Sequence, residues 1–288
     1  MKLATFAGID GPRLGIVKGD ALINVSDHLP ELKSLEALLE GGSDLLERTR
    51  RIAAFEPTTI GLSTVRLLAP LTRPQKFLAI GMNYRKHAEE AKRFGIEPPK
   101  YQYWFNKQTS CLSGPYDPIV KPRVSDMLDY EVELAMIIGK PAKHVNAERA
   151  SEYIFGYTVC NDVSVRDWQS HCPTMTIGKS FDTHGPIGPW VVTADEIPDP
   201  HNLSLCCEVN GVVRQQSSTS ELIFNCYQMI EYLSTAFTLL PGDIIATGTP
   251  EGVGIAMDPP TFLRVGDTVR CEVEGIGAIE NVVILESV

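Results

Sequence analysis

Several sequence signatures of common protein classes are missing from this chain of 288 residues. Its seven cysteines are odd in number and include no C-x-x-C pair, which disfavours both a disulfide framework and a zinc site. No run rich in lysine and arginine occurs, and the formal net charge is −10 at pH 7, so nucleic acid is disfavoured as a partner. The longest apolar runs, such as residues 134–138, are too short to cross a bilayer, and the first residues contain no secretory signal. We therefore expect a cytoplasmic protein with reduced thiols and neither a membrane nor a nucleic acid as partner.

Two enzyme motifs are also absent. The sequence contains no G-x-S-x-G, which disfavours a serine hydrolase of the common α/β type. The glycine-rich residues 246–254 (ATGTPEGVG) lack the lysine that a phosphate-binding P-loop requires. Neither of these two common mechanisms is therefore indicated.

The apolar pattern predicts two parts. Residues 1–26 alternate polar and apolar side chains around turns, as a β-meander does, and residues 34–54 have helical spacing with a Gly-Gly break. The proline-bearing segment 69–77 follows. We place a domain boundary in it, between a small N-terminal α+β domain (1–72) and a larger domain (73–288).

The larger part mixes many strands with a few helices. We expect strands at 77–81, 132–139, 157–163 and 244–250, helices at 84–95, 147–154 and about 220–238, and a hairpin over 267–287. No βα unit repeats regularly, which argues against a Rossmann fold and a TIM barrel. The expected fold class is a strand-rich, mixed α/β roll.

An acidic pair stands in the apolar run 128–140 (LDYEVELAMIIGK). Glu131 and Glu133 are two residues apart, so in a strand both carboxylates project to one side. With Asp162, at the end of another expected strand, they offer the oxygen ligands that Mg²⁺ or Mn²⁺ prefers. The alternative is a solvated edge strand, on which these carboxylates, like the nearby Asp126 and Asp129, are surface charges.

Three further groups of residues could carry chemistry. His87 and Glu90 are three apart on an expected helix and could form a general-base pair, or an incidental ion pair on an exposed face. Lys179, in the loop GKSFDTHGPIGP, could stabilise an enolate or simply be solvated. Thr249, in the glycine-rich loop, could contact a ligand or belong to a structural turn, and the loop residue His184 is more typical of a turn than of catalysis.

Taken together, these motifs are similar in order and type to those of one family. They are NYRKHAEE (83–90), DYEVELAMIIGK (129–140), NDVSVRDWQ (161–169), GKSFDTHGPIGP (178–189), VNGVVRQQSS (209–218), LLPGDIIATGTPEGVG (239–254) and GDTVRCEVEGIG (266–277). Over residues 73–288 the chain resembles the fumarylacetoacetate hydrolase family. The resemblance implies a mixed β-sandwich roll, a homodimer, and one Mg²⁺ or Mn²⁺ in each subunit.

The resemblance also implies residue roles. The expected metal ligands are Glu131, Glu133 and Asp162; the expected catalytic residues are His87, Glu90 and Lys179; and the expected substrate-binding residues are Gln169, Thr249 and, less firmly, Arg166. Such a site suits a 2-oxo acid, whose carboxylate and 2-oxo oxygen chelate the cation.

The leading functional interpretation is hydrolysis of the C3–C4 bond of a 2,4-dioxo acid, an acylpyruvate or a 2,4-diketo-3-deoxy sugar acid, to pyruvate and a second carboxylic acid. The alternatives are an oxaloacetate decarboxylase, a hydroxymuconate-type isomerase or hydratase, and an inactive metabolite-binding scaffold. All the enzymatic reactions share an enolate, so the motifs alone do not select one of them.

Two positions depart from the family pattern. Thr174 and Met175 replace an aromatic-bearing pair that precedes the lysine in many relatives, and His184 replaces an aliphatic or aromatic residue. We expect both departures to alter the pocket for the distal part of the substrate, and a more polar pocket would suit a hydroxylated tail.

Overall fold

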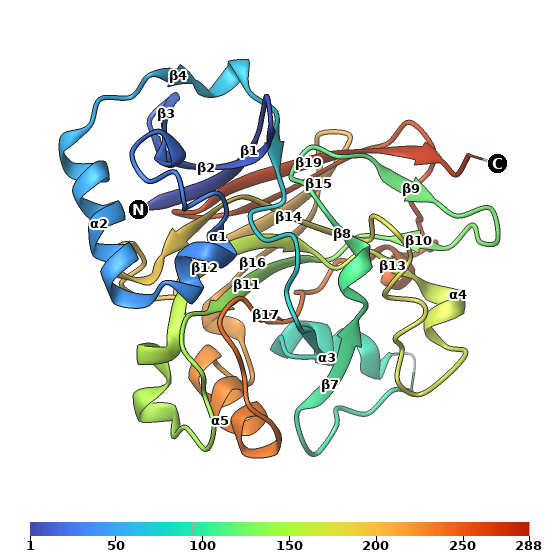
Figure 1. The fold of residues 1–288 in the computed structure, drawn as a ribbon. Coiled ribbons are helices and arrows are strands. Elements are labelled where there is room, and N and C mark those ends of the chain that lie inside the picture. Colours follow the sequence, from blue (N-terminus) through green and yellow to red (C-terminus); the bar gives the residue numbers. More distant parts are fainter. Residues whose placement is uncertain (94, 288) are drawn as a thin grey trace.

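The computed structural model describes residues 1–93 and 95–287, and most strands in these ranges fall into two large sheets (Figure 1). The larger sheet contains β1 (Lys2–Gly8), β2 (Gly11–Lys18), β3 (Ala21–Asn24), β4 (Ile60–Gly61), β5 (Leu67–Leu68), β6 (Phe77–Gly81), β7 (Tyr103–Lys107), β8 (Leu112–Ser113), β11 (Val132–Ile138), β12 (Ile154–Asn161), β14 (Gly185–Thr193) and β17 (Ile244–Ala246). Its main path runs β4-β3-β2-β1-β14-β12-β11-β17-β6-β7, with β5 beside β1 and β8 beside β14.

The second sheet has the order β16-β15-β18-β19-β9 and packs against the first. Its strands are β9 (Ile119–Lys121), β15 (Ser204–Val209), β16 (Val212–Ser218), β18 (Thr268–Val273) and β19 (Gly277–Leu285). The short strands β10 (Leu128–Asp129) and β13 (Ser164–Val165) form a separate pair. The expected strand-rich mixed α/β fold is confirmed, including the meander β1–β3 and the terminal hairpin β18–β19.

The N-terminal region shares a sheet with the rest of the chain. Strand β1 pairs with β14 in antiparallel register, with Lys2 opposite Val192 and Leu3 opposite Val191. The backbone of residues 1–72 therefore continues the large sheet at β14. The domain boundary between residues 72 and 73 stays a prediction.

Strand β11 lies inside the large sheet and is buried on both faces, between β12 and β17. Leu134 and Met136 belong to the core shared with the five-stranded sheet, whereas Ala135 and Ile137 belong to the core that includes α1 (Leu35–Glu40). Because side chains alternate along a strand, Glu133 lies on the same face as Ala135. This alternation places a carboxylate inside the protein.

The helices agree with the sequence in part. Helices α1 and α2 (Gly42–Phe55) flank the predicted Gly-Gly break, and α3 (Arg85–Lys92) matches the helix expected at 84–95. The segment expected to be helical at 147–154 is instead a 3₁₀ helix, Ala147–Tyr153.

The helix predicted at about 220–238 is shorter than expected, which corrects that prediction. Thr219–Glu221 form a separate 3₁₀ turn, and α5 begins at Cys226 and ends at Ala236. The cause is Asn225, whose side chain accepts hydrogen bonds from the N–H groups of Tyr227 and Gln228 while Gln228 Oε1 accepts from Asn225 N. This capping box fixes the start of the helix six residues later than apolar spacing suggests.

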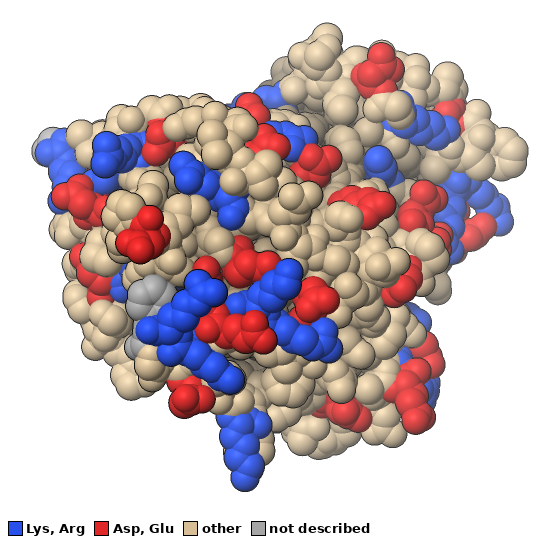
Figure 2. Space-filling view, turned by 180° about the vertical axis from the view of Figure 1, so that it is seen from behind, with Lys and Arg blue, Asp and Glu red and all other residues tan. Residues whose placement is uncertain are grey.

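On the face shown in Figure 2, Lys and Arg side chains are interleaved with Asp and Glu. Two ion pairs link α3 to other segments, with Arg85 3.7 Å from Glu221 and Lys86 3.6 Å from Glu251. Among the described residues, no helix is long and apolar enough to span a membrane.

The Asn225 cap gives a stability prediction. Replacing Asn225 with Ala should lower the free energy of unfolding by about 1 kcal/mol, because two N–H groups of the first turn of α5 lose their acceptor. Urea unfolding followed by circular dichroism measures this change. The exposed Asn202→Ala variant is the control, and equal stability of the two variants would contradict the assignment of the helix start.

Candidate metal centre and active site

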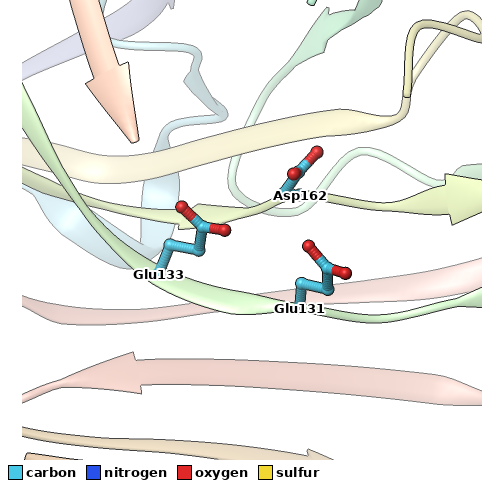
Figure 3. Close-up of side chains that lie close together, drawn as sticks. All are labelled: Glu131, Glu133 and Asp162. Carbon is cyan, nitrogen blue, oxygen red and sulfur yellow. The ribbon is translucent and has the colours of Figure 1, made fainter. Parts of the chain in front are cut away.

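Three carboxylates meet where β11 begins and β12 ends. Glu131 and Glu133 flank Val132, and Asp162 directly follows β12, whose Asn161 pairs with Val132. One oxygen from each carboxylate lies within 4.8 Å of one oxygen from each of the others. Figure 3 shows the three side chains facing a common space. They are only 4%, 1% and 0% exposed in residue order, so the alternative of a solvated edge strand is wrong.

Buried cations surround two of these carboxylates. Lys179 Nζ lies 2.6 Å from Glu131 Oε2 and 2.8 Å from Asp162 Oδ2. Lys107 Nζ lies 2.6 Å from Asp162 Oδ1 and also donates to the backbone carbonyl of Lys179. Lys179 therefore lies at the acidic cluster rather than in solvent, and Lys107 ties Asp162 to the Lys179 backbone.

Arg166 joins the cluster to a fourth buried carboxylate. Its Nη1 lies 2.7 Å from Glu131 Oε1, and its Nε donates to Asp129 Oδ2 at 2.8 Å. Asp129 also accepts from the N–H groups of Gly254 and Ile255, which fixes the loop after β17. Asp129 is fully buried and is thus not a surface charge, whereas the side chain of Asp126 is 97% exposed.

The two glutamates have opposite electrostatic environments. Burial raises the pKa of Glu131, but Lys179 and Arg166 outweigh burial and lower that pKa to about 2. For Glu133, burial and then the neighbouring carboxylates of Asp162 and Glu131 raise the pKa well above its usual range. Glu133 Oε2 accepts from Gly248 N at 2.7 Å, a neutral donor. Within the described residues, then, the cluster holds four buried carboxylates against three buried cations.

The cluster fits a hard divalent cation. It presents carboxylate oxygens only, as Mg²⁺ and Mn²⁺ prefer, and its oxygens already converge. A cation there would supply the positive charge that Glu133 lacks. Glu131, Glu133 and Asp162 are the residues that could hold it.

These residues adjoin a cavity of about 430 Å³. Its polar lining consists of His87, Glu90, Glu131, Glu133, Arg166, Gln169, Ser170, Lys179 and Thr249. Its apolar lining includes Ile80, Met82, Ala91, Ile96, Tyr103, Phe105, Met175, Val253, Ile255 and Ala256. The structure thus brings eight of the nine predicted site residues to one cavity, and the ninth, Asp162, contacts it through Lys179.

His87 and Glu90 form the predicted pair on α3. His87 Nδ1 lies 2.9 Å from Glu90 Oε2, and Glu90 Oε1 accepts from Gly252 N at 3.2 Å. Their side chains are 16% and 12% exposed, so this pair is not on a solvated helix face. With Nδ1 bonded to the carboxylate, Nε2 is the ring nitrogen left for proton transfer.

Gln169 and Thr249 are also held in place. Gln169 Oε1 accepts from Arg166 Nη1 at 3.0 Å, and its Nε2 lies 3.1 Å from Met175 Sδ. Thr249 Oγ1 donates to the carbonyl of Val132 and accepts from Gln215 Nε2 at 2.8 Å. Thr249 is therefore part of a structural turn and also lines the cavity, and its contact with a ligand stays a prediction.

Gly248 shows why the loop after β17 is glycine-rich. Its φ is +98°, and a Cβ there would lie 2.8 Å from Cβ of Asn83. This close approach lets Gly248 N reach Glu133. Asn83 in turn donates to the carbonyl of Thr247 at 2.9 Å and anchors the same loop.

The expectation that Thr174 and His184 shape the distal pocket is wrong. Neither residue lines the cavity, whereas Met175 does. His184 is fully buried, with Nε2 bonded to the carbonyl of Val120 at 2.9 Å and its ring 5.5 Å from that of Phe181. The apolar lining at Met175 also argues against the more polar pocket that a hydroxylated tail would need.

Sequence reasoning missed Lys107 and did not separate Asp129 from the surface charges. A signal for Lys107 existed, because it stands two residues after Phe105 and the two share one face of β7. Asp129 had no such signal, since its burial depends on Arg166 and on the loop at Gly254.

With the geometry established, comparison with known proteins gives the class and then the family. A strand-rich fold with a buried triad of carboxylates beside a cavity is typical of a metal-dependent enzyme. Residues 76–284 match the family described as fumarylacetoacetate (FAA) hydrolase C-terminal. The chain belongs to the fumarylacetoacetate hydrolase family, as the sequence motifs predicted.

The names of similar proteins describe several different enzymatic activities. Over 291 residues the chain is 43% identical to oxaloacetate tautomerase FAHD2A, mitochondrial, of Bos taurus, an alignment that covers 99% of this chain and 92% of the relative. A solved structure of maleylpyruvate hydrolase from Sphingobium sp. SYK-6, in complex with manganese(II) and pyruvate, is 34% identical with a TM-score of 0.84 and full coverage of both chains. The 5-carboxymethyl-2-hydroxymuconate delta-isomerase from Mycobacterium smegmatis is 37% identical with a TM-score of 0.79, again with full coverage of both chains.

The cluster predicts a metal-binding phenotype. Replacing Glu133 with Gln should weaken Mn²⁺ binding at least about 100-fold, because an anionic ligand is lost while the side-chain shape is kept. The metal-free variant should be no less stable than the parent, since a buried carboxylate without a cationic partner becomes a neutral amide. Calorimetric titration with Mn²⁺ measures the affinity.

The matched control for this variant is Asp126→Asn, at a nearby exposed carboxylate. It should leave the Mn²⁺ affinity unchanged. Equal Mn²⁺ affinities of Glu133→Gln and the parent protein would contradict the metal assignment.

His184 predicts a pH dependence of stability. Burial lowers its pKa to about 4 from 6.5, so unfolding takes up a proton between these pH values. The stabilising contribution of neutral His184 is therefore complete above pH 6.5 and is lost as the pH falls towards 4, by up to about 3 kcal/mol. Urea unfolding at several pH values gives the free energy of unfolding as a function of pH. Between pH 4 and 6.5 the slope of this free energy against pH should be shallower for His184→Gln than for the parent. Identical slopes would refute this, and the exposed His171→Gln variant serves as the control.

Proposed function

We propose that this chain is a divalent-metal-dependent enzyme that moves a proton at C3 of a 2-oxo acid, with oxaloacetate as the substrate and keto–enol tautomerisation as the reaction. The observation that carries the proposal is one cavity lined by Glu131 and Glu133 of the carboxylate triad and by the His87–Glu90 pair. The identity to an oxaloacetate tautomerase over nearly the whole chain supports this choice of reaction.

Arg166 and Lys179 are the residues we assign to the anionic substrate. Arg166 lines the cavity and is only 8% exposed. No described group pairs with its Nη2. Such an unpaired guanidinium nitrogen matches a carboxylate oxygen of a 2-oxo acid. Lys179, whose ammonium lies between Glu131 and Asp162, is placed to stabilise negative charge that develops on the C2 oxygen.

The proton transfer uses His87. Its Nδ1–H donates to Glu90, so Nε2 holds a lone pair and removes a proton from C3. The electron pair of that C–H bond forms the C2–C3 double bond, and the C2 oxygen takes the negative charge. A divalent cation at the triad would act as a Lewis acid towards the C2 carbonyl. Delivery of this proton to the C2 oxygen gives the enol, and in the reverse direction the proton of the enol hydroxyl is delivered to C3 and gives the ketone.

A second candidate function is hydrolysis of the C3–C4 bond of a 2,4-dioxo acid, the leading interpretation from the sequence. The similarity to maleylpyruvate hydrolase and a cavity that continues past the polar end with apolar lining favour it. His87 would then take a proton from water, whose oxygen forms a bond to C4. The C3–C4 bond breaks, its electron pair goes to the pyruvate enolate, and the proton from His87 goes to C3.

One pair of assays separates the two candidates. For a tautomerase, the protein accelerates the loss of enol-oxaloacetate absorbance, and EDTA abolishes the acceleration while no pyruvate forms. For a hydrolase, acetylpyruvate yields pyruvate and acetate in equal amounts. Failure of both reactions in the presence of Mg²⁺ and Mn²⁺ would sink the proposal.

The base assignment predicts a kinetic phenotype. His87→Gln should lower kcat for oxaloacetate tautomerisation by about 10² to 10⁴, because the proton acceptor at C3 is removed. Mn²⁺ affinity should stay within a few fold, since His87 is not one of the triad. His28→Gln, at an exposed histidine in the N-terminal region, is the control. A kcat for His87→Gln within threefold of the parent would rule out His87 as the base.

We also propose that the chain forms a homodimer. Val282, Ile284 and Leu285 on β19 are 46%, 40% and 50% exposed, which is apolar surface that a second subunit could cover. Light scattering after gel filtration measures the mass, and a monomer at micromolar concentration would contradict this.

A further inference from the structure

The loop between α4 (Arg166–Gln169) and Lys179 contributes Ser170 and Met175 to the lining of the cavity. Met175 has φ +56°, in the left-handed region that non-glycine residues rarely adopt, and its N–H donates to the carbonyl of Cys172 at 3.1 Å. Met82, at the end of β6, also lines the cavity and has φ +53°. Two methionines in unfavourable backbone conformations at one cavity point to a requirement of the site rather than of the fold.

The Met175 side chain ends a series of contacts that begins at the metal centre. Arg166 Nη1 contacts Glu131 Oε1 at 2.7 Å and Gln169 Oε1 at 3.0 Å. Gln169 Nε2 donates to Met175 Sδ at 3.1 Å. A thioether is a weak acceptor, so an oxygen of a ligand displaces it readily from the amide of Gln169.

Beyond Gln169 the lining becomes apolar. The methyl group of Met175 approaches β6, where a Cβ built on Gly81 would lie 3.7 Å from it, and Tyr103 Cδ1 would lie 3.2 Å from the same Cβ. Tyr103 Oη donates to the carbonyl of Pro173 at 2.7 Å and thereby fixes the loop that carries Met175. The cavity therefore has an apolar wall of Met82, Tyr103 and Met175.

The cations that line the cavity are already assigned to the metal ligands and to the head group of the substrate. Among the described lining residues, the cationic side chains are Arg166 and Lys179, and both contact Glu131. A second carboxylate that reached past Gln169 would be desolvated without a cation. Each methylene group of an apolar tail in the same place would instead tighten the binding of the ligand about fourfold.

We propose that Met175 is the specificity-determining residue for whatever a substrate carries beyond C4, and that it selects apolar substituents. This inference rests on the proposed function, because it takes a 2-oxo acid head group at the triad as given. Oxaloacetate ends at C4 and does not reach Met175, so the enzyme would accept it together with longer 2-oxo acids that have apolar tails. The flexible thioether adapts to tails of different shape.

The test compares two six-carbon ligands that differ only at C6, a methyl group against a carboxylate, and uses pyruvate, which ends at C3, as the reference without a tail. Calorimetry with the Mn²⁺-loaded protein gives the Kd of pyruvate, 2-oxohexanoate and 2-oxoadipate, which share the head group. The parent should bind 2-oxohexanoate at least tenfold more tightly than 2-oxoadipate. Met175→Lys should lower the ratio of these two affinities at least tenfold or reverse it. Met175→Trp should weaken the binding of 2-oxohexanoate alone. The Kd of pyruvate should change less than about twofold in both variants.

The matched control is Ile177→Lys, which places the same charge on the same loop at a side chain that is 52% exposed. It should keep the parent's ratio of affinities. Equal affinity of the parent for 2-oxohexanoate and 2-oxoadipate, or an equal effect of the Met175 variants on pyruvate and 2-oxohexanoate, would overturn the assignment.

The outcomes also separate this inference from the proposed function. If the parent binds none of these 2-oxo acids, the proposed function fails and the assignment of Met175 fails with it. If pyruvate binds but the ratio does not respond to Met175, only the specificity assignment fails. If the ratio responds as expected but no 2-oxo acid is turned over, Met175 keeps its role and the proposed reaction is wrong.

Discussion

The burial of four carboxylates against three cations is the constraint on which the rest of this structure depends. Lys107, Lys179 and Arg166 compensate three of the negative charges at distances of 2.6–2.8 Å, and Glu133 is left with a backbone donor. Unpaired charge inside a protein is unfavourable, so this arrangement persists only where a cation or a proton completes it. The capacity of the cluster to hold a divalent cation therefore follows from how its charges are buried.

The scaffold holds these charges with rigid elements. Glu133 is on a strand buried on both faces, and the loop after β17 closes over it because Gly248 can approach Asn83. Helix α3 brings His87 to the same cavity, tied to this loop through Glu90 and Gly252. The proposed acid–base pair and the candidate metal ligands thus lie near the start of β11, an arrangement that would suit both of the reactions proposed above.

Local patterns in the sequence predicted what depends on neighbours along the chain. The two-residue spacing of Glu131 and Glu133 and the three-residue spacing of His87 and Glu90 gave contacts that the structure has. Features that depend on distant partners were not predicted, although the position of Lys107 on the same face of β7 as Phe105 was a signal for its burial. Lys107 is buried because Asp162, 55 positions away, balances its charge, and α5 starts late because the side chain of Asn225 competes with an apolar pattern that runs past it. His184 was assigned to the pocket because nothing in its own neighbourhood reveals the carbonyl of Val120, 64 positions away.

The central claim is that the triad and His87 together remove a proton from C3 of a 2-oxo acid. Exchange of the methyl protons of pyruvate with deuterium oxide, followed by proton NMR, tests it most directly, because enolisation is common to both candidate reactions and needs no knowledge of the distal group. We expect the protein to catalyse an exchange that requires Mg²⁺ or Mn²⁺ and stops when EDTA is added. Exchange at the uncatalysed rate with metal present, or enzyme-catalysed exchange that EDTA leaves unchanged, would contradict it.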